Sequence, residues 1–182
     1  MKNFVNFRRE AFGDVLREKG LHGIGIEIGV AAGNYSKIII ENFGLNKLYL
    51  LDNWKGYEYV SQTKQDIFYK NILELAEQHK ELVEVIKSDS INGVGQFEDE
   101  YFDFIYIDAD HHYEAVVYDL KLWYPKVKKG GLFSGHDYTG HETDKNFGVT
   151  QAVDEFVEKL ELSLFITQGT KRIPSSWYFI KP

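Results

Sequence analysis

The sequence predicts an α/β fold in which a doubly wound, mostly parallel sheet of seven strands carries helices on both faces. Short runs rich in β-branched and aromatic residues alternate along the chain with segments whose apolar residues recur at helical spacing. This alternation is typical of a parallel sheet, because each crossover between parallel strands needs a connection long enough for a helix. At the end of the chain two strands are separated by residues 168–175 alone, so we expect an antiparallel hairpin there.

The elements follow in order. Residues 4–19 have the apolar spacing of a helix, and Gly20 is a typical stop; this first helix, within residues 1–20, is a candidate lid or homodimer contact. The predicted strands are 25–30, 47–52, 83–89, 102–108, 131–134, 162–167 and 176–180. The predicted later helices are 34–43, 63–79, 90–97, 113–128 and 149–160.

Composition narrows the class of protein. A chain of 182 residues with 43% hydrophobic residues fits a single domain, 1–182, with a substantial core. A net charge of -7 gives no global attraction to nucleic acid or to an anionic membrane, so nucleic-acid and membrane partners are disfavoured. The absence of cysteine excludes disulfides and thiolate zinc sites. No apolar run approaches the roughly 18 residues of a membrane span, and we interpret the protein as cytoplasmic.

A glycine-containing turn follows the first predicted strand and leads into a helix. Gly29 and Gly33 let the backbone approach a ligand closely, and the free N–H groups of the helix start could bind it. Glu27 would repel a pyrophosphate but attract an ammonium or sulfonium group. The Gly-x-x-x-Gly spacing also departs from the Gly-x-Gly-x-x-Gly of dinucleotide sites. A turn that binds nothing is the other interpretation.

Polar residues follow the next two strands. Asp52 has the placement at which a carboxylate accepts hydrogen bonds from ribose hydroxyls, although it could instead cap the turn after it. Trp54 and Tyr57 could stack on a base or pack a loop onto the domain. Asp89 and Ser90 could accept from an adenine amino group or cap a helix. The polar stretches 53–62 and 138–148 are candidate lids.

The richest cluster of chemical groups follows the fourth and fifth strands. Asp108 and Asp137 offer hard oxygen ligands suited to Mg²⁺ or Mn²⁺, and adjacent parallel strands would bring them together. Asp110 and His111 offer acceptors for a proton, which suggests catalysis. Alternatively, Asp110 caps the helix that begins near residue 113 while the histidines face solvent.

The longest motif starts in the fourth strand. It comprises residues 102–114, Asp119-Leu120, Trp123-Tyr124-Pro125, Lys129-Gly130-Gly131, Gly135-His136-Asp137-Tyr138, Gly148-Val149 and residues 152–156. With these motifs the chain, from about residue 20 to 182, resembles class I S-adenosylmethionine (SAM)-dependent methyltransferases. Within them it is similar to small O-methyltransferase-like proteins related to macrocin and sugar O-methyltransferases.

The resemblance implies a Rossmann-like, seven-stranded sheet with the terminal hairpin, and SAM as the cofactor. It places residues 27–33 beside the methionine part, Asp52 on the ribose, and Asp89 and Ser90 near adenine. The candidate cofactor-binding residues are Glu27, Gly29, Ala31, Gly33, Tyr35, Ser36, Asp52, Asn53, Trp54, Asp89, Ser90 and Asp108.

The resemblance also implies a metal site. In metal-dependent members a carboxylate matching Asp108 and an acidic pair matching His136-Asp137 hold Mg²⁺, and the acid matching Asp110 is the general base. Here the first member of the pair is histidine, and imidazole suits transition metals better than Mg²⁺. The candidate ligands of a Mg²⁺ or Mn²⁺ ion are therefore Asp108, His136 and Asp137.

The resulting hypothesis is methyl transfer from SAM to a hydroxyl of a small molecule such as a sugar, glycoside or polyphenol. Asp110 would take the proton, with His111 as the alternative base in a metal-free mechanism. An NAD(P)-dependent oxidoreductase could use the same sheet, but Glu27 and the glycine spacing count against it. A catalytically silent SAM-binding module is the other alternative, and the presence of Asp108, Asp110 and Asp137 argues against it.

Overall fold

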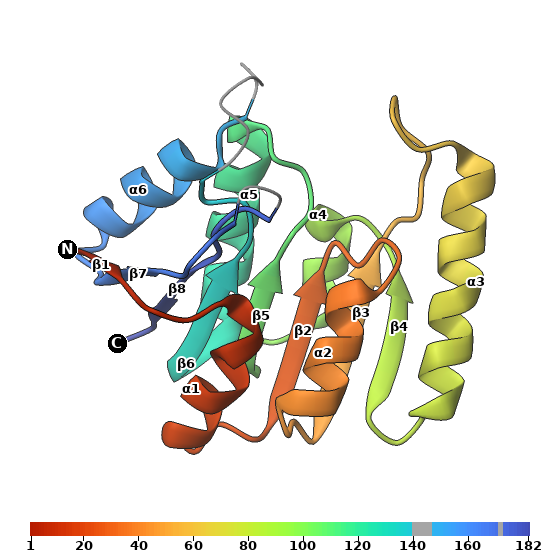
Figure 1. Ribbon diagram of the computed structural model, residues 1–182, viewed down its shortest axis with the longest axis horizontal. Helices are drawn as coiled ribbons and strands as arrows, with labels where there is room; N and C mark the ends of the chain where they lie inside the picture. Colours follow the sequence, from red (N-terminus) through yellow and green to blue (C-terminus); the bar gives the residue numbers. More distant parts are fainter. Residues whose placement is uncertain (140–146, 171–172) are drawn as a thin grey trace.

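The computed structural model of the protein describes residues 1–139, 147–170 and 173–182 (Figure 1). The strands are β1 Lys2–Phe4, β2 Ile24–Ile28, β3 Lys47–Asp52, β4 Val83–Lys87, β5 Phe102–Ile107, β6 Val127–Gly135, β7 Leu164–Ile166 and β8 Trp177–Ile180. The α-helices are α1 Phe12–Glu18, α2 Asn34–Asn42, α3 Gln62–Gln78, α4 Ser90–Gly93, α5 Tyr113–Trp123 and α6 Val149–Lys159. Short 3₁₀ turns span Arg9–Ala11, Val94–Gln96 and Tyr124–Lys126.

The strands form one sheet in the order β1-β7-β8-β6-β5-β2-β3-β4. The five strands from β6 to β4 are parallel, and β8 is antiparallel to both β6 and β7. The predicted mixed sheet and its terminal hairpin are confirmed. The chain winds outward from β2 through β3 to β4 and then returns to β5 on the other side of β2. The crevice at the carboxyl ends of β2 and β5 is thus the topological switch point, where such sheets bind ligands.

The sheet separates two apolar cores because alternate side chains of each strand point to opposite faces. On β5, Ile105 and Ile107 pack with residues of α5 and α6, whereas Phe104 and Tyr106 pack with residues of α1 and α2. Every residue of β5 is buried, as expected of a central strand covered on both faces. Helices cover both faces of the sheet in Figure 1.

The N-terminal segment differs from the prediction of one helix over residues 4–19 and of a seven-stranded sheet. Lys2–Phe4 is an eighth strand paired with β7, and Val5 N–H continues the pairing by donating to Ile166 O at 2.9 Å. Phe4, which fitted the helical apolar spacing, is 78% exposed. Backbone hydrogen bonds to an open sheet edge therefore outweigh the local spacing, and the helix begins only at Phe12. Its end is as predicted, with Gly20 in the left-handed region at φ 69°.

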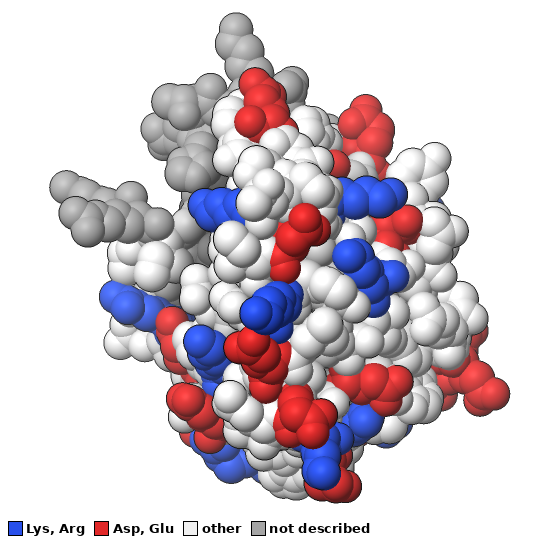
Figure 2. Space-filling model, turned by 90° about the vertical axis from the view of Figure 1, so that its right-hand side faces the viewer, with Lys and Arg blue, Asp and Glu red and all other residues white. Residues whose placement is uncertain are grey.

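The surface and the loops add three findings. In the described parts of the chain, no helix is long and apolar enough to cross a membrane. On the face that carries α3, basic and acidic side chains are interspersed rather than gathered by sign (Figure 2). Of the two predicted lids, 53–62 connects β3 to α3, and 138–148 lies mostly outside the described residues, since 140–146 are not among them.

Candidate functional site

A cavity of about 640 Å³ lies at the carboxyl ends of β2, β3, β4 and β5, at the switch point. Its size is within the range of cofactor and small-molecule pockets. The candidate cofactor residues that line it are Gly29, Ala31, Asp52, Asn53, Asp89, Ser90 and Asp108, and the candidate catalytic residues Asp110 and His111 line it as well. The structure therefore brings together residues from four separate strand ends that the sequence singled out.

The glycine turn lies directly against the end of β5. Gly29 has φ 88°, and a side chain there would collide with the backbone of Asp108 and Ala109. Gly33 has φ 75°, and a side chain there would collide with Ile72 of α3. Both glycines are thus required by packing within the chain, and this packing shapes the cavity wall that a ligand would meet.

Asp52 joins this turn to the end of β3. Its Oδ2 accepts from the backbone N–H groups of Val30 and Ala31, each at 2.9 Å, and its Oδ1 accepts from Trp54 N–H at 2.8 Å. A carboxylate can accept about four hydrogen bonds, so capacity remains for a ribose hydroxyl. Asp52 therefore orders the turn and also presents a carboxylate to the cavity.

Other candidate cofactor residues lie behind the cavity wall: Glu27, Gly33, Tyr35, Ser36 and Trp54 are absent from its lining. Glu27 is 1% exposed and accepts a hydrogen bond from the Ser36 hydroxyl. Burial raises the pKa of Glu27 to about 8. Trp54 is fully buried and packs against Tyr69 in a tilted arrangement with 4.7 Å between ring centroids. Its Nε1 donates to Ala31 O at 3.1 Å. This geometry matches loop packing rather than base stacking.

Asp89 caps α4. Its Oδ1 accepts from Asn92 N–H and its Oδ2 from Asn92 Nδ2, both at 2.8 Å. The hydrogen bond from the Asn92 backbone holds the pKa of Asp89 below its usual value. The capping interpretation of this residue is thus realised in the structure, although Asp89 also lines the cavity.

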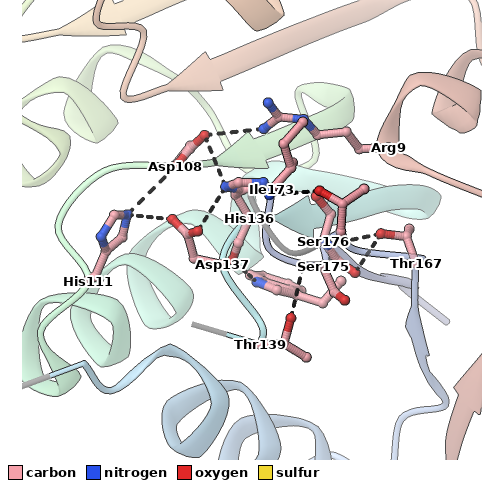
Figure 3. Close-up of polar contacts among 12 residues, drawn as sticks. Arg9, Asp108, His111, His136, Asp137, Thr139, Thr167, Ile173, Ser175 and Ser176 are labelled. Carbon is pink, nitrogen blue, oxygen red and sulfur yellow. Dashed lines mark hydrogen bonds and ion pairs between the residues drawn. The ribbon is translucent and has the colours of Figure 1, made fainter. Parts of the chain in front are cut away.

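Two carboxylates and an imidazole converge beside the cavity (Figure 3). One ligand atom each from Asp108, His111 and Asp137 lies within 4.8 Å of the others. His111 Nε2 is 2.8 Å from Asp137 Oδ2 and 3.7 Å from Asp108 Oδ1. The parallel pairing of β5 with β6, which sets Ile107 opposite Gly135, brings these strand ends together as the sequence predicted.

The charges in this group are strongly coupled. Burial alone would lower the pKa of His111, but the carboxylates of Asp108 and Asp137 raise it to about 10. Burial alone would raise the pKa of Asp137, but His111 and His136 hold it well below its usual range. In the absence of a metal the imidazolium of His111 therefore neutralises part of the acidic charge.

The donor set fits a divalent transition metal. His111 Nε2 lies close to the carboxylates of Asp108 and Asp137. Both His111 Nε2 and His136 Nε2 are buried and form no hydrogen bond of regular geometry among the described residues. His136 Nδ1 lies 3.0 Å from Asp137 Oδ1 and 3.8 Å from Asp108 Oδ2. The group of possible metal ligands thus consists of Asp108, Asp137 and His111, and the sequence did not assign His111 to the metal. His136 contacts Asp137 through its Nδ1.

Comparison with protein families decides the class. A family model described as a methyltransferase domain matches residues 26–138, which include the glycine turn, Asp52 and the acidic cluster. The chain belongs to this methyltransferase family. The resemblance drawn from the sequence is confirmed, and the protein is a SAM-dependent methyltransferase. No curated protein sequence matches it significantly.

Solved structures show the same fold for this methyltransferase. It is similar to an O-methyltransferase from Bacillus cereus in complex with SAH, with 21% identity, a TM-score of 0.62, and coverage of 94% of this chain and 80% of the other. A SAM-dependent methyltransferase from Aquifex aeolicus has 18% identity and a TM-score of 0.60, and the match covers 96% of this chain and 94% of the other. The O-methyltransferase NovP has 15% identity and a TM-score of 0.66, and the match covers 94% of this chain and 77% of the other.

Asp110 closes the turn that leads into α5 of the methyltransferase. Its Oδ1 accepts from His112 N–H at 2.9 Å and lies 2.5 Å from His112 Nδ1. Burial is the largest single effect and raises its pKa, but the hydrogen bonds from His112 and the charges of His112 and His111 together outweigh burial and lower the pKa. Its side chain is 58% exposed and faces the cavity, so it is reachable by a substrate.

Arg9 is a site residue of the methyltransferase that the sequence did not reveal. Its Nη1 donates to the Tyr106 hydroxyl at 2.7 Å and lies 3.5 Å from Asp108 Oδ2. Its guanidinium lies 4.3 Å from the ring centroid of Tyr35, whose hydroxyl donates to Arg9 O at 3.0 Å. Ninety-nine positions separate Arg9 from Asp108, so no local pattern could predict the pair.

Proposed function

We propose that the protein transfers the methyl group of SAM to a hydroxyl of a small molecule, such as a sugar, glycoside or polyphenol, with assistance from a divalent metal. One observation carries the proposal. A single cavity is lined both by the glycine turn and Asp52 and by Asp108 and His111. A cofactor bound along the first set would have its reactive end near the second.

The chain's residues can place the two ends of the cofactor. Asp52 has acceptor capacity toward a ribose, and Gly29 lets the turn pack directly against the end of β5. Glu27 lies behind this turn as a buried carboxyl that gains from a nearby cation, so the sulfonium or ammonium of SAM would favour its ionised form.

Asp108, His111 and Asp137 would hold the metal, which when bound lowers the pKa of an acceptor hydroxyl. His111 directs its Nε2 toward the two carboxylates and not toward open space. Asp110 has its carboxylate on the cavity and outside this group, so we assign the proton-accepting role to Asp110. Mn²⁺ suits this set better than Mg²⁺ because one ligand is imidazole.

The reaction is an in-line displacement. The acceptor oxygen forms a bond to the methyl carbon as the carbon–sulfur bond breaks, the hydroxyl proton passes to Asp110, and S-adenosylhomocysteine leaves. Holding the two reactants in line supplies several kcal/mol of the acceleration. The chain contributes by fixing both reactants at one end of a partly enclosed cavity.

The first test is calorimetric titration with SAM and with NAD, followed by assay of S-adenosylhomocysteine formation over a panel of sugars, glycosides and polyphenols, with EDTA or Mn²⁺. We expect SAM to bind and NAD not to bind, and Asp137→Asn to lose turnover. Glu77→Gln, which removes a carboxylate on α3, is the control and should retain it. Failure to bind SAM would overturn the proposal. SAM binding without turnover on any hydroxyl would favour the silent module instead.

A further inference from the structure

Helix α5 presents a buried carboxyl to the cofactor cavity. Asp119 is only 2% exposed, yet it is part of the cavity lining together with Ala115, one helical turn before it. The proposed reaction gives Asp119 no role. Asp119 lies beside Ser90, at the end of β4, since its carboxyl forms a hydrogen bond with the Ser90 side chain.

A buried carboxyl is costly unless hydrogen bonds compensate for the lost water. Burial raises the pKa of Asp119 to about 6, and a hydrogen bond with the Ser90 side chain offsets only part of this effect. At neutral pH the group is mainly a carboxylate with acceptor capacity beyond this one hydroxyl. A ligand that brings an N–H donor into the cavity would supply the missing partner.

The neighbouring acid is less suited to that task. Both oxygens of Asp89 are engaged by Asn92 at the start of α4. Ile91 and Ala115 add apolar surface to the cavity near Asp119, which suits the faces of a flat heterocycle. The carboxylate would then meet the edge of that ring.

We infer that Asp119, oriented by Ser90, accepts a hydrogen bond from the exocyclic amino group of adenine and selects the adenine base of the cofactor. The inference rests on the proposed binding of SAM and goes beyond it by naming the group that distinguishes adenine from a 6-oxopurine. A site built to accept an N–H rejects an analogue that lacks it, because the buried acceptor is left unpaired.

The test compares calorimetric affinities for S-adenosylhomocysteine and for its inosine analogue, which carries a carbonyl in place of the amino group. We expect the wild type to prefer the adenine compound by about 10- to 100-fold, as expected for one unpaired buried acceptor. Asp119→Asn should reduce this ratio at least about 10-fold or invert it, because an amide can donate to the carbonyl. Asp99→Asn, a carboxylate paired with Lys126 outside the cavity, should keep the wild-type ratio.

Two further variants keep the test decisive. Should Asp119→Asn fail to fold, Ser90→Ala must still narrow the ratio, since it removes the hydroxyl that orients Asp119. A wild type that binds both compounds equally, or a ratio that collapses in Asp89→Asn and persists in Asp119→Asn, overturns the inference while leaving the proposed function intact. Failure of the wild type to bind S-adenosylhomocysteine at all would instead overturn the proposed function.

Discussion

Arg9 lies with its Nη1 3.5 Å from Asp108 Oδ2, so a residue of the N-terminal segment reaches the centre of the candidate site (Figure 3). The opposite oxygen, Asp108 Oδ1, faces His111 at 3.7 Å. The two oxygens of one carboxylate are therefore directed at different partners. This arrangement makes Arg9 a positioning residue for Asp108, held in turn by the hydroxyl of Tyr106.

Replacing Arg9 tests this role. Arg9→Met keeps the packing on Tyr35 but leaves Asp108 and the buried Tyr106 hydroxyl without their charged partner. Hydrogen bonds to charged groups contribute about 1.5–3 kcal/mol, so we expect kcat to fall about 10- to 100-fold. If SAM binds along the glycine turn and Asp52, as proposed, its affinity should change little in this variant.

Arg8→Met is the matched control, because Arg8 is exposed and adjacent in sequence. The measurement is kcat and KM for SAM in both variants, with thermal unfolding as a check on folding. Equal activity of Arg9→Met and Arg8→Met would exclude a positioning role for Arg9.

The buried Glu27 predicts an unusual pH dependence of stability. Burial raises its folded-state pKa to about 8, above the ordinary value of 4.5. The folded protein therefore binds more protons than the unfolded chain between these two values, and the contribution of Glu27 to stability falls as pH rises through that window. Below pH 4.5 this contribution is fully present.

Glu27→Gln keeps an acceptor for Ser36 without a titrating group. Relative to this variant, the unfolding temperature of the wild type should fall as the pH is raised from about 5 to 8. Saturation with SAM should restore part of the lost stability, because the cation of SAM favours the carboxylate form of Glu27. Parallel curves for the two proteins across this range would show that Glu27 does not titrate as described.

The sequence predicted most of the fold and the edge of the sheet that carries the site, because both depend on local patterns. Strand periodicity placed Asp52, Asp89, Asp108 and Asp137 at strand ends, and parallel pairing then brought them to one edge. The missed features depend on contacts distant in sequence. Arg9 and strand β1 are fixed by pairing with residues near 106 and 164, for which the helical spacing of residues 4–19 gave no signal.

Side-chain directions were equally beyond the sequence. The resemblance implied His136 as a ligand, whereas the carboxylate of Asp137 contacts both histidines, with Oδ2 2.8 Å from His111 Nε2 and Oδ1 3.0 Å from His136 Nδ1. Likewise, nothing local distinguishes a Trp54 that stacks on a base from one that packs on Tyr69. Such choices are made by packing rather than by pattern.

The metal group yields the next prediction. If Asp108, His111 and Asp137 hold the ion, His111→Ala should weaken Mn²⁺ affinity more than His136→Ala does, with an effect of about 10- to 100-fold expected for the supporting His136. His22→Ala, an exposed histidine away from the cavity, is the control. Mn²⁺ titration followed by electron paramagnetic resonance gives the three affinities. A larger loss in His136→Ala would assign the site to Asp108, His136 and Asp137 instead.

Asp110 gives the most direct test of the chemistry. Asp110→Asn retains an oxygen that can accept from His112 N–H, so the turn into α5 should persist. The variant cannot take the acceptor's proton, and we expect turnover to fall by about 10² or more, with SAM affinity nearly unchanged. Glu114→Gln removes one negative charge from the first turn of the same helix and should leave turnover within a few-fold of the wild type. The rate of S-adenosylhomocysteine formation in a single turnover, measured as a function of pH, distinguishes the Asp110→Asn variant from the Glu114→Gln variant. Normal turnover in Asp110→Asn would show that Asp110 is not the general base and that another group accepts the proton.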